Sequence, residues 1–218
     1  MHSAPRPRLV SALELLLGTA LVVGHNVFHV LPNEVPLLAI LGLVSFRVRG
    51  GGWSALPFRR PESWTRVLLI ALAVAALRIV LGGVVEALAA KVWPPIVPPA
   101  GSEAIATSPA AALKWLGIVW TWAAFGEEFG YRGYLLARAA DLGGGSKAAW
   151  VAGTVFVAVL FGLGHFYKGP AGVLDSGIAG LLLGAAYLAA GRNLWACVLA
   201  HGFIDTFGIA ALSFGWAS

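Results

Sequence analysis

Long apolar stretches separated by short polar or turn-forming segments run along the whole chain. Several of them exceed the ~18 apolar residues that mark a spanning helix. The expected helices are Leu9–Leu31, Val35–Phe46, Trp64–Lys91, Ala110–Ala140, Ala148–His165, Ala171–Ala190 and Leu194–Trp216. Val35–Phe46 has room for one tight span only. The pattern predicts an all-α fold, a polytopic membrane bundle of about seven transmembrane helices.

Composition supports this class. Hydrophobic residues make up 59% of the 218 residues and charged residues only 11%, which is too apolar for a soluble domain of this size. The net charge of +5 could suggest nucleic acid. In a membrane protein, however, excess Lys and Arg reflects topology and contact with anionic lipid, so we expect lipid and no nucleic acid as a partner. The single cysteine, Cys197, excludes an intramolecular disulfide and is expected to be a small buried residue.

Cationic residues are distributed unevenly between the predicted loops. With alternating spans, eleven fall on one side and three, Lys91, Lys114 and Lys168, on the other. The eleven are Arg6, Arg8, Arg47, Arg49, Arg59, Arg60, Arg66, Arg132, Arg138, Lys147 and Arg192. By the positive-inside rule the N-terminus is cytoplasmic and the C-terminus outside. Short loops and the absence of an organelle signal suggest a prokaryotic plasma membrane.

The first helix follows a basic tail, residues 1–8, as a signal peptide would. The stretch is long, contains Glu14 and lacks a clear small-residue cleavage site, so we interpret it as a retained anchor. His25 and His29 lie four residues apart, a spacing that can bind metal. No acidic residue is close to them in this helix, which favours a pair of interfacial histidines.

Three other features have structural interpretations. Arg78 is expected to face the bundle interior, too far from Glu86 for direct contact. Asp175 stands alone near a helix start, where capping explains it. The small residues Gly177, Gly180 and Gly184 permit close helix packing.

The segment Phe125–Gly133 sets two glutamates and an arginine into this apolar sequence, and we expect the pair to lie near the end of a membrane helix. Glu128 and Arg132 are four residues apart and share a helix face, while Glu127 points about 100° away. An ionisable residue within a span costs roughly 2.5–3.5 kcal/mol on insertion scales. The pair therefore either has a function or caps and orients the helix end.

Two more polar groups occur in the later helices: His165, four residues after Phe161, and His201, four residues before Asp205. Lipid cannot satisfy such groups, so they turn toward each other or toward a wet cavity. A carboxylate, two imidazoles and a second carboxylate suit the activation of water, by a general base or through a metal. A structural polar network and the proton path of a transporter are the alternatives.

Together the three groups resemble the motifs EExxxR, FxxxH and HxxxN or HxxxD of the CAAX protease and bacteriocin-processing family of intramembrane endopeptidases. They are Glu127-Glu128-Phe-Gly-Tyr-Arg132, Phe161-Gly-Leu-Gly-His165 and His201-Gly-Phe-Ile-Asp205. The resemblance covers roughly residues 110–210. It divides a single membrane domain, residues 1–218, into N-terminal helices, 1–109, and a catalytic core, 110–213.

The resemblance implies a site inside the helix bundle and hydrolysis of a peptide bond in a membrane-associated peptide or protein. Substrates in the family include prenylated C-termini, and bacterial relatives are linked to bacteriocin maturation and immunity. Carried over, Glu127 and His165 would activate the water, and His201 and Asp205 would stabilise the oxyanion or complete the site. Glu128 and Arg132 would support the helix and position Glu127.

The role of a metal stays open at this point. Where the family has Asn at position 205, its amide can donate to an oxyanion, whereas ionised Asp205 cannot. Asp205 could instead orient His201 or bind a cation. The set Glu127, His165, His201 and Asp205 is compatible with Zn²⁺, and metal-free hydrolysis is equally compatible. Our hypothesis is that Asp205 orients His201.

Other classes of membrane protein can be compared with the same residues. The zinc-protease motif HExxH, a membrane serine-protease motif and a paired-aspartate site are absent from the sequence. A transporter would be expected to show an inverted repeat, and none is visible. The remaining rival is a non-catalytic membrane protein of the same fold that acts as an immunity factor or binds a partner.

Overall fold

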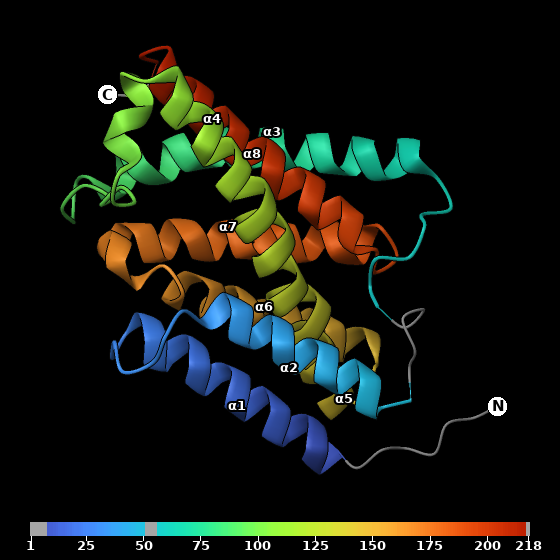
Figure 1. The fold of residues 1–218 in the computed structure, drawn as a ribbon. Coiled ribbons are helices and arrows are strands. Elements are labelled where there is room, and N and C mark those ends of the chain that lie inside the picture. The colour runs from blue at the N-terminus through green and yellow to red at the C-terminus, as the bar shows by residue number, and fades with distance from the viewer. Residues whose placement is uncertain (1–7, 51–55, 217–218) are drawn as a thin grey trace.

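The computed structural model describes residues 8–50 and 56–216, and this part of the chain is entirely helical apart from its turns and loops. Its helices pack side by side, with one of them crossing the others obliquely (Figure 1). They are α1 (Arg8–Asn26), α2 (Glu34–Val48), α3 (Trp64–Ala89), α4 (Pro109–Ile118), α5 (Leu136–Leu142), α6 (Lys147–Leu163), α7 (Gly169–Ala189) and α8 (Leu194–Ser213). The prediction of an all-α membrane bundle is confirmed.

Helix α4 continues without a break through two π-helical segments into α5, so that residues 109–142 form one rod. The segments are η3 (Val119–Glu127) and η4 (Phe129–Leu135). Two short 3₁₀ helices, η2 (Ser102–Ala106) and η5 (Phe166–Lys168), lie in the loops. In the described residues the chain thus forms the seven rods that the apolar pattern predicts.

Four helical stretches are long and apolar enough to cross a membrane. They are Arg8–Asn26, Trp64–Ala89, Phe166–Ala189 and Leu194–Ser213. Helix α6 is apolar but shorter, with 17 residues. A multi-pass membrane protein is therefore supported, while the exact number of spans and the assignment of residues 1–218 to a single domain stay predictions.

Side-chain caps explain several of the boundaries. Ser63, Ser108 and Ser146 accept hydrogen bonds from the first-turn amides of α3, α4 and α6. Asn193 does the same at the start of α8. The DLGGGS segment ends the rod as expected, and Ser146, not Asp141, is the cap.

Glycines bring α6 and α7 into close contact. A Cβ atom added at Gly162 would lie 2.7 Å from the carbonyl oxygen of Val173, and one at Gly180 would lie 3.1 Å from Cα of Ala158. Gly184 faces Thr154 in the same way. The prediction that Gly177, Gly180 and Gly184 permit close packing is confirmed, and it matters because α7 lies behind the polar groups described below.

We expect Gly162→Ala to lower the stability of the purified protein by about 1–3 kcal/mol, because the new methyl group meets backbone that cannot rotate away. The control is Gly83→Ala in α3, where nothing lies within 4 Å of the added Cβ. The control should leave the melting temperature in detergent close to that of the wild type. Equal melting temperatures for the two variants would contradict this account of the α6–α7 contact.

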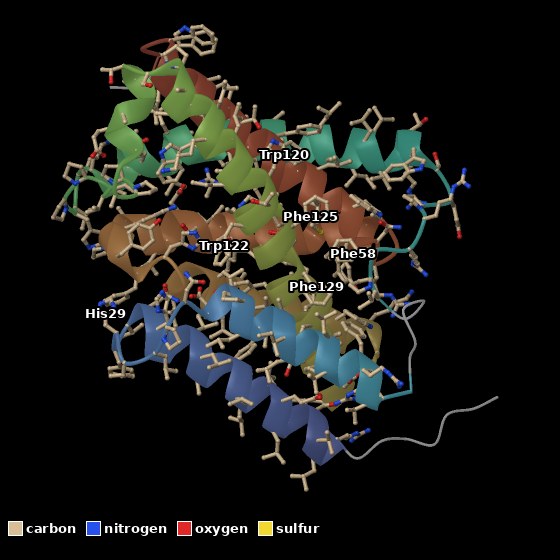
Figure 2. The ribbon with its side chains drawn as sticks, in the orientation of Figure 1. His29, Phe58, Trp120, Trp122, Phe125 and Phe129 are labelled. Carbon is tan, nitrogen blue, oxygen red and sulfur yellow. The ribbon has the colours of Figure 1, made fainter. Side chains whose placement is uncertain are left out.

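Aromatic side chains fix the rod against α8 and the loop before α3. Phe58 stacks on Phe125 and on Phe129 of the rod, with ring centroids 5.8 Å apart in both pairs. The three residues are labelled in Figure 2. Trp195 of α8 lies 5.7 Å from Phe58 and 5.5 Å from Phe125. The rod is thereby clamped on either side of its two glutamates.

One end of the bundle carries most of the cationic residues of the described part. Arg49 binds Ser11, Glu14 and Asp141, which joins the start of α1, the end of α2 and the end of α5. Arg59 donates to the carbonyl of Gly191 and Arg66 to that of Ala189, between α7 and α8. We call this the arginine-rich end; its cations are Arg8, Arg47, Arg49, Arg59, Arg60, Arg66, Arg138, Lys147 and Arg192.

Two of the sequence predictions about charges are wrong. Arg132, expected among the loop cations, is fully buried. Asp175 is not a helix cap, because it lies in the second turn of α7 and forms an ion pair with Arg78 of α3 at 2.5 Å. Arg78 faces the bundle interior as predicted. Arg6 and the rest of residues 1–7 lie outside the described residues.

Candidate active site

The rod carries Glu127 and Glu128 at its centre, not near a helix end as the sequence suggested. Both residues lie at the junction of the two π-helical segments. The helix continues past them because the following residues are mostly apolar and contain no proline, and because Glu128 has a cation one turn later. π-Helical turns in membrane and soluble helices are frequent at functional sites.

Glu128 is the centre of a buried network that joins three helices. Its Oε1 accepts hydrogen bonds from Arg132 at 2.8 Å and from Nδ1 of His201 at 2.7 Å. Arg132 also donates to the carbonyl of Gly180 in α7 at 2.9 Å and lies over the ring of Phe161, 4.4 Å from its centroid. Glu128 and Arg132 therefore tie the rod to α7 and α8, and Glu128 fixes the orientation of His201.

His165 lies two residues after the end of α6, and its ring is held by the backbone. Nδ1 is 2.8 Å from the carbonyl oxygen of Phe161, and the two rings are 4.8 Å apart. A carbonyl can only accept, so Nδ1 carries the hydrogen and a neutral ring presents the lone pair of Nε2 to the site. The i, i+4 pair predicted from the FxxxH spacing thus sets the tautomer.

Asp205 lies one turn after His201, with its Oδ2 atom 3.5 Å from Nε2. The two nitrogen atoms of His201 therefore face two carboxylates, Glu128 at the shorter distance and Asp205 at the longer one. The ring of Phe161 packs between the histidines, 6.0 Å from His201. The structure thus brings the three sequence motifs into one region of the bundle.

Glu127 makes no hydrogen bond to the Glu128 network in the described residues. It is half-buried, and its buried Oε2 atom has no hydrogen-bond partner in the described residues. The charges of His201 and Asp205 act on it. A buried carboxylate oxygen without a partner is costly, and such atoms in native proteins usually await a ligand or a water molecule. Glu127 is thus the one acidic residue of the motifs that is not used to hold another side chain.

Two further residues contact this region, and the sequence motifs did not identify them. The hydroxyl of Tyr131 donates to Oε1 of Glu34 at 3.3 Å, and Oε2 of Glu34 lies 3.6 Å from Nε2 of His25. Tyr131 also lies against Gly164, since a Cβ added there would be 2.5 Å from its hydroxyl. Glu34 and Tyr131 are buried, and the charge of Glu34 acts on Glu127.

Glu34 also changes the interpretation of the first histidine pair. His25 has an acidic partner that the sequence did not reveal, because the turn after α1 brings the start of α2 back onto it. His29 lies in that turn with a left-handed backbone, φ 54°, and points outward (Figure 2). His25 thus contacts a carboxylate and a backbone carbonyl of its own.

The predicted ligand set can be compared with the geometry of a metal site. In the part of the chain that the structure describes, no group of three or more His, Cys, Asp and Glu side chains is arranged to hold a metal ion. His201 already directs both of its ring nitrogens at carboxylates, and Nδ1 of His165 is bound to backbone. These hydrogen bonds at Nδ1 leave the Nε2 atoms of both histidines available, so Zn²⁺ held by Glu127, His165, His201 and Asp205 stays a prediction.

Comparison with protein families agrees with the motifs. Residues 109–207 match the family model described as Rce1-like, the type II CAAX prenyl endopeptidase Rce1-like family. The chain carries an Rce1-like domain. The domain begins with α4 and includes all of the motif residues, whereas α1, α2 and α3 lie outside it. Neither the curated proteins nor the solved structures searched gave a match.

The Rce1-like domain confirms the family recognised from the three motifs, and this family is described as one of type II CAAX prenyl endopeptidases. Glu34, on α2, contacts the region from outside the Rce1-like domain. No motif of the family could therefore have pointed to Glu34; only the fold does.

Proposed function

We propose that this protein is an intramembrane endopeptidase that cleaves a membrane-associated peptide or protein, and that Glu127 is its general base. The observation that supports this most is the Oε2 atom of Glu127, which is buried and has no hydrogen-bond partner in the described residues. His165 and His201, from the other two motifs, have their orientations fixed by other groups. A general base contributes about 10²–10⁴-fold to the rate when it is held close to the proton it removes.

In this proposal a water molecule lies between Glu127 and His165. Nε2 of His165 accepts a hydrogen bond from the water, and Glu127 takes a proton as the oxygen attacks the peptide carbonyl carbon. The negative charge that develops on the carbonyl oxygen is met by Nε2–H of protonated His201. Glu127 then returns the proton to the leaving nitrogen, the C–N bond breaks, and the products are a carboxylate and an amine.

The supporting residues keep these groups in place. Glu128 pairs with Arg132 and accepts the Nδ1 hydrogen of His201, an arrangement that stabilises a charged imidazole ring. Asp205 faces Nε2, the other ring nitrogen of His201. It would orient the ring, or lose this contact when Nε2–H donates to the substrate oxyanion. This assigns Glu128, Arg132 and Asp205 to positioning, with Glu127, His165 and His201 as the groups that meet substrate or water.

A direct test uses the purified protein in lipid vesicles with a panel of membrane-anchored peptides, including a farnesylated C-terminal peptide. Products are identified by mass spectrometry, with and without a chelator. Cleavage within a peptide chain is the expected result. Cleavage that stops with chelator and returns with Zn²⁺ would contradict the metal-free steps. A protein that binds these peptides without cutting any of them would be the partner-binding alternative.

We expect Glu34→Gln and Tyr131→Phe each to reduce kcat by up to about tenfold, since each removes one hydrogen bond beside the site. KM should change little, because neither residue is expected to touch the substrate. The double variant should be no slower than the slower single variant, which a double-mutant cycle measures. The control is Glu86→Gln on the exposed face of α3. Fully additive effects would contradict a joint role.

A further inference from the structure

A crevice separate from the candidate active site lies at the arginine-rich end, between the start of α3 and the turn that joins α7 to α8. Its volume is about 220 Å³, and none of its lining residues belongs to the three motifs. Three arginines and one glutamate give the lining a net charge of +2, so the crevice favours an anion. The charged and polar lining residues are Arg59, Arg60, Glu62, Ser63, Arg66 and Asn193.

Two of the three guanidinium groups are held in place by the backbone. Arg59 donates from Nη2 to the carbonyl of Gly191, and Arg66 donates from Nη2 to the carbonyl of Ala189. Within the described part of the chain these two side chains make no other hydrogen bond, and the exposed side chain of Arg60 makes none. Their remaining N–H groups can therefore donate to a ligand. Arginine presents these groups in a planar fork that matches the oxygen atoms of a phosphate.

The two helices that begin at the crevice add donors of their own. Ser63 caps α3 by accepting the N–H of Arg66, so its hydroxyl hydrogen can be donated to a ligand. Asn193 caps α8, and its side-chain nitrogen donates to the carbonyl of Arg59, which fixes the segment before α3 against the start of α8. The first amides of a helix carry a partial positive charge and favour an anion. The arginines and the two helix starts thus surround the same crevice.

An exposed apolar face of α3 begins beside the crevice. Trp64, the first residue of α3, follows Ser63 and is 47% exposed. Leu68 and Leu72 follow at intervals of four residues and are also exposed, so the three side chains share one face of the helix. Tryptophan is enriched in membrane proteins at the level of the lipid headgroups, and α3 is long and apolar enough to cross a membrane. The crevice therefore lies at headgroup level, and an apolar surface leads from it toward the hydrocarbon.

We infer that the crevice binds the phosphate group of an anionic phospholipid, one acyl chain of which lies along Trp64, Leu68 and Leu72. A free phosphate ion would use the cationic donors alone, whereas a phospholipid uses the donors and the apolar face. A zwitterionic headgroup would bring a further cation to a lining of net charge +2. The bound headgroup would join the start of α3 to the start of α8, the helix that carries His201 and Asp205. Such binding requires no catalysis, so it is independent of the proposed endopeptidase activity.

Native mass spectrometry of the delipidated protein in detergent tests the inference. The protein is titrated with phosphatidylglycerol or with phosphatidylcholine of the same acyl chains, and the first lipid bound gives an apparent Kd. The variants are Arg60→Gln and the double variant Arg60→Gln with Arg66→Gln. Arg47→Gln is the matched control, because Arg47 is an exposed arginine at the same end that does not line the crevice. Melting temperatures are measured without lipid, with each lipid and with inorganic phosphate.

We expect the wild type to bind phosphatidylglycerol about tenfold more tightly than phosphatidylcholine, the effect of one charge-assisted hydrogen bond or two. Arg60→Gln should lose about threefold to tenfold in affinity for phosphatidylglycerol, and the double variant should lose the preference between the lipids. Arg47→Gln should keep both. Without lipid, Arg60→Gln should melt at the temperature of the wild type, so that its loss of binding is not a loss of fold.

Equal affinity of the wild type for the two lipids would overturn the inference. It would also be overturned if Arg47→Gln lost as much affinity as Arg60→Gln, since the cause would then be the charge of the whole end and not the crevice. Phosphatidylglycerol should raise the melting temperature of the wild type, and inorganic phosphate at the same concentration should raise it less. No rise with the lipid would contradict a specific site, and an equal rise with phosphate would assign the crevice to a free anion.

Discussion

Arg132→Ala is expected to destabilise the protein by about 3–5 kcal/mol, the cost of leaving a buried carboxylate without its cation. Glu128 would lose the ion pair at 2.8 Å, and the carbonyl of Gly180 would lose its donor. The measurement is the thermal unfolding of the purified protein in detergent. Because Glu128 holds His201, we also expect cleavage to fall below detection.

The matched control is Arg60→Ala at the exposed, arginine-rich end, which should shift stability by no more than about 0.5 kcal/mol. A second variant, Glu128→Gln combined with Arg132→Met, removes both charges and should recover part of the lost stability without recovering activity. If Arg132→Ala melts at the temperature of the wild type, the buried network does not support the fold as described here.

Glu127→Gln is expected to lower the rate of peptide cleavage by about 10²–10⁴-fold with little change in stability. The amide keeps the size and polarity of the side chain but cannot take a proton from water. Glu127 holds no other side chain in the described structure, so its replacement leaves the Glu128 network intact. Single-turnover cleavage in vesicles gives the rate of the chemical step.

Glu103→Gln on the exposed η2 helix is the control for the change of charge and should cleave at the wild-type rate. Comparison with Glu128→Gln separates the two adjacent glutamates. We expect Glu128→Gln to lose both stability and activity, and Glu127→Gln to lose activity alone. A Glu128→Gln variant with full stability and a Glu127→Gln variant that unfolds would reverse the two roles.

Much of the fold and the motif residues could be predicted because they depend on local patterns. Apolar stretches broken by Pro32, Pro36 and the glycine-rich turns give the helices, and the i, i+4 spacing places Glu128 with Arg132 and His201 with Asp205. The ends of the helices were less well predicted, since the first helix was expected to reach Leu31 and ends at Asn26. The residues that follow Asn26 form a turn that leads into α2.

The unpredicted features all depend on which helices become neighbours. The pair of Arg78 with Asp175 and the contact of Tyr131 with Glu34 each join residues 97 positions apart. Glu128 and His201 are 73 positions apart, and their contact gives Glu128 a part in orienting His201 that the sequence assigned to Asp205 alone. Spacing along one helix cannot reveal such contacts. The Rce1-like motifs located the site, and the fold supplied the residues around it.

The most direct test of the account is cleavage of a membrane-anchored peptide in water enriched in heavy oxygen, by the wild type and Glu127→Gln side by side in vesicles. The account predicts that the wild type releases a product whose new C-terminal carboxylate contains one heavy oxygen atom from the solvent. Glu127→Gln should release almost none over the same time. Product formed by Glu127→Gln at the wild-type rate would contradict the central role of this carboxylate.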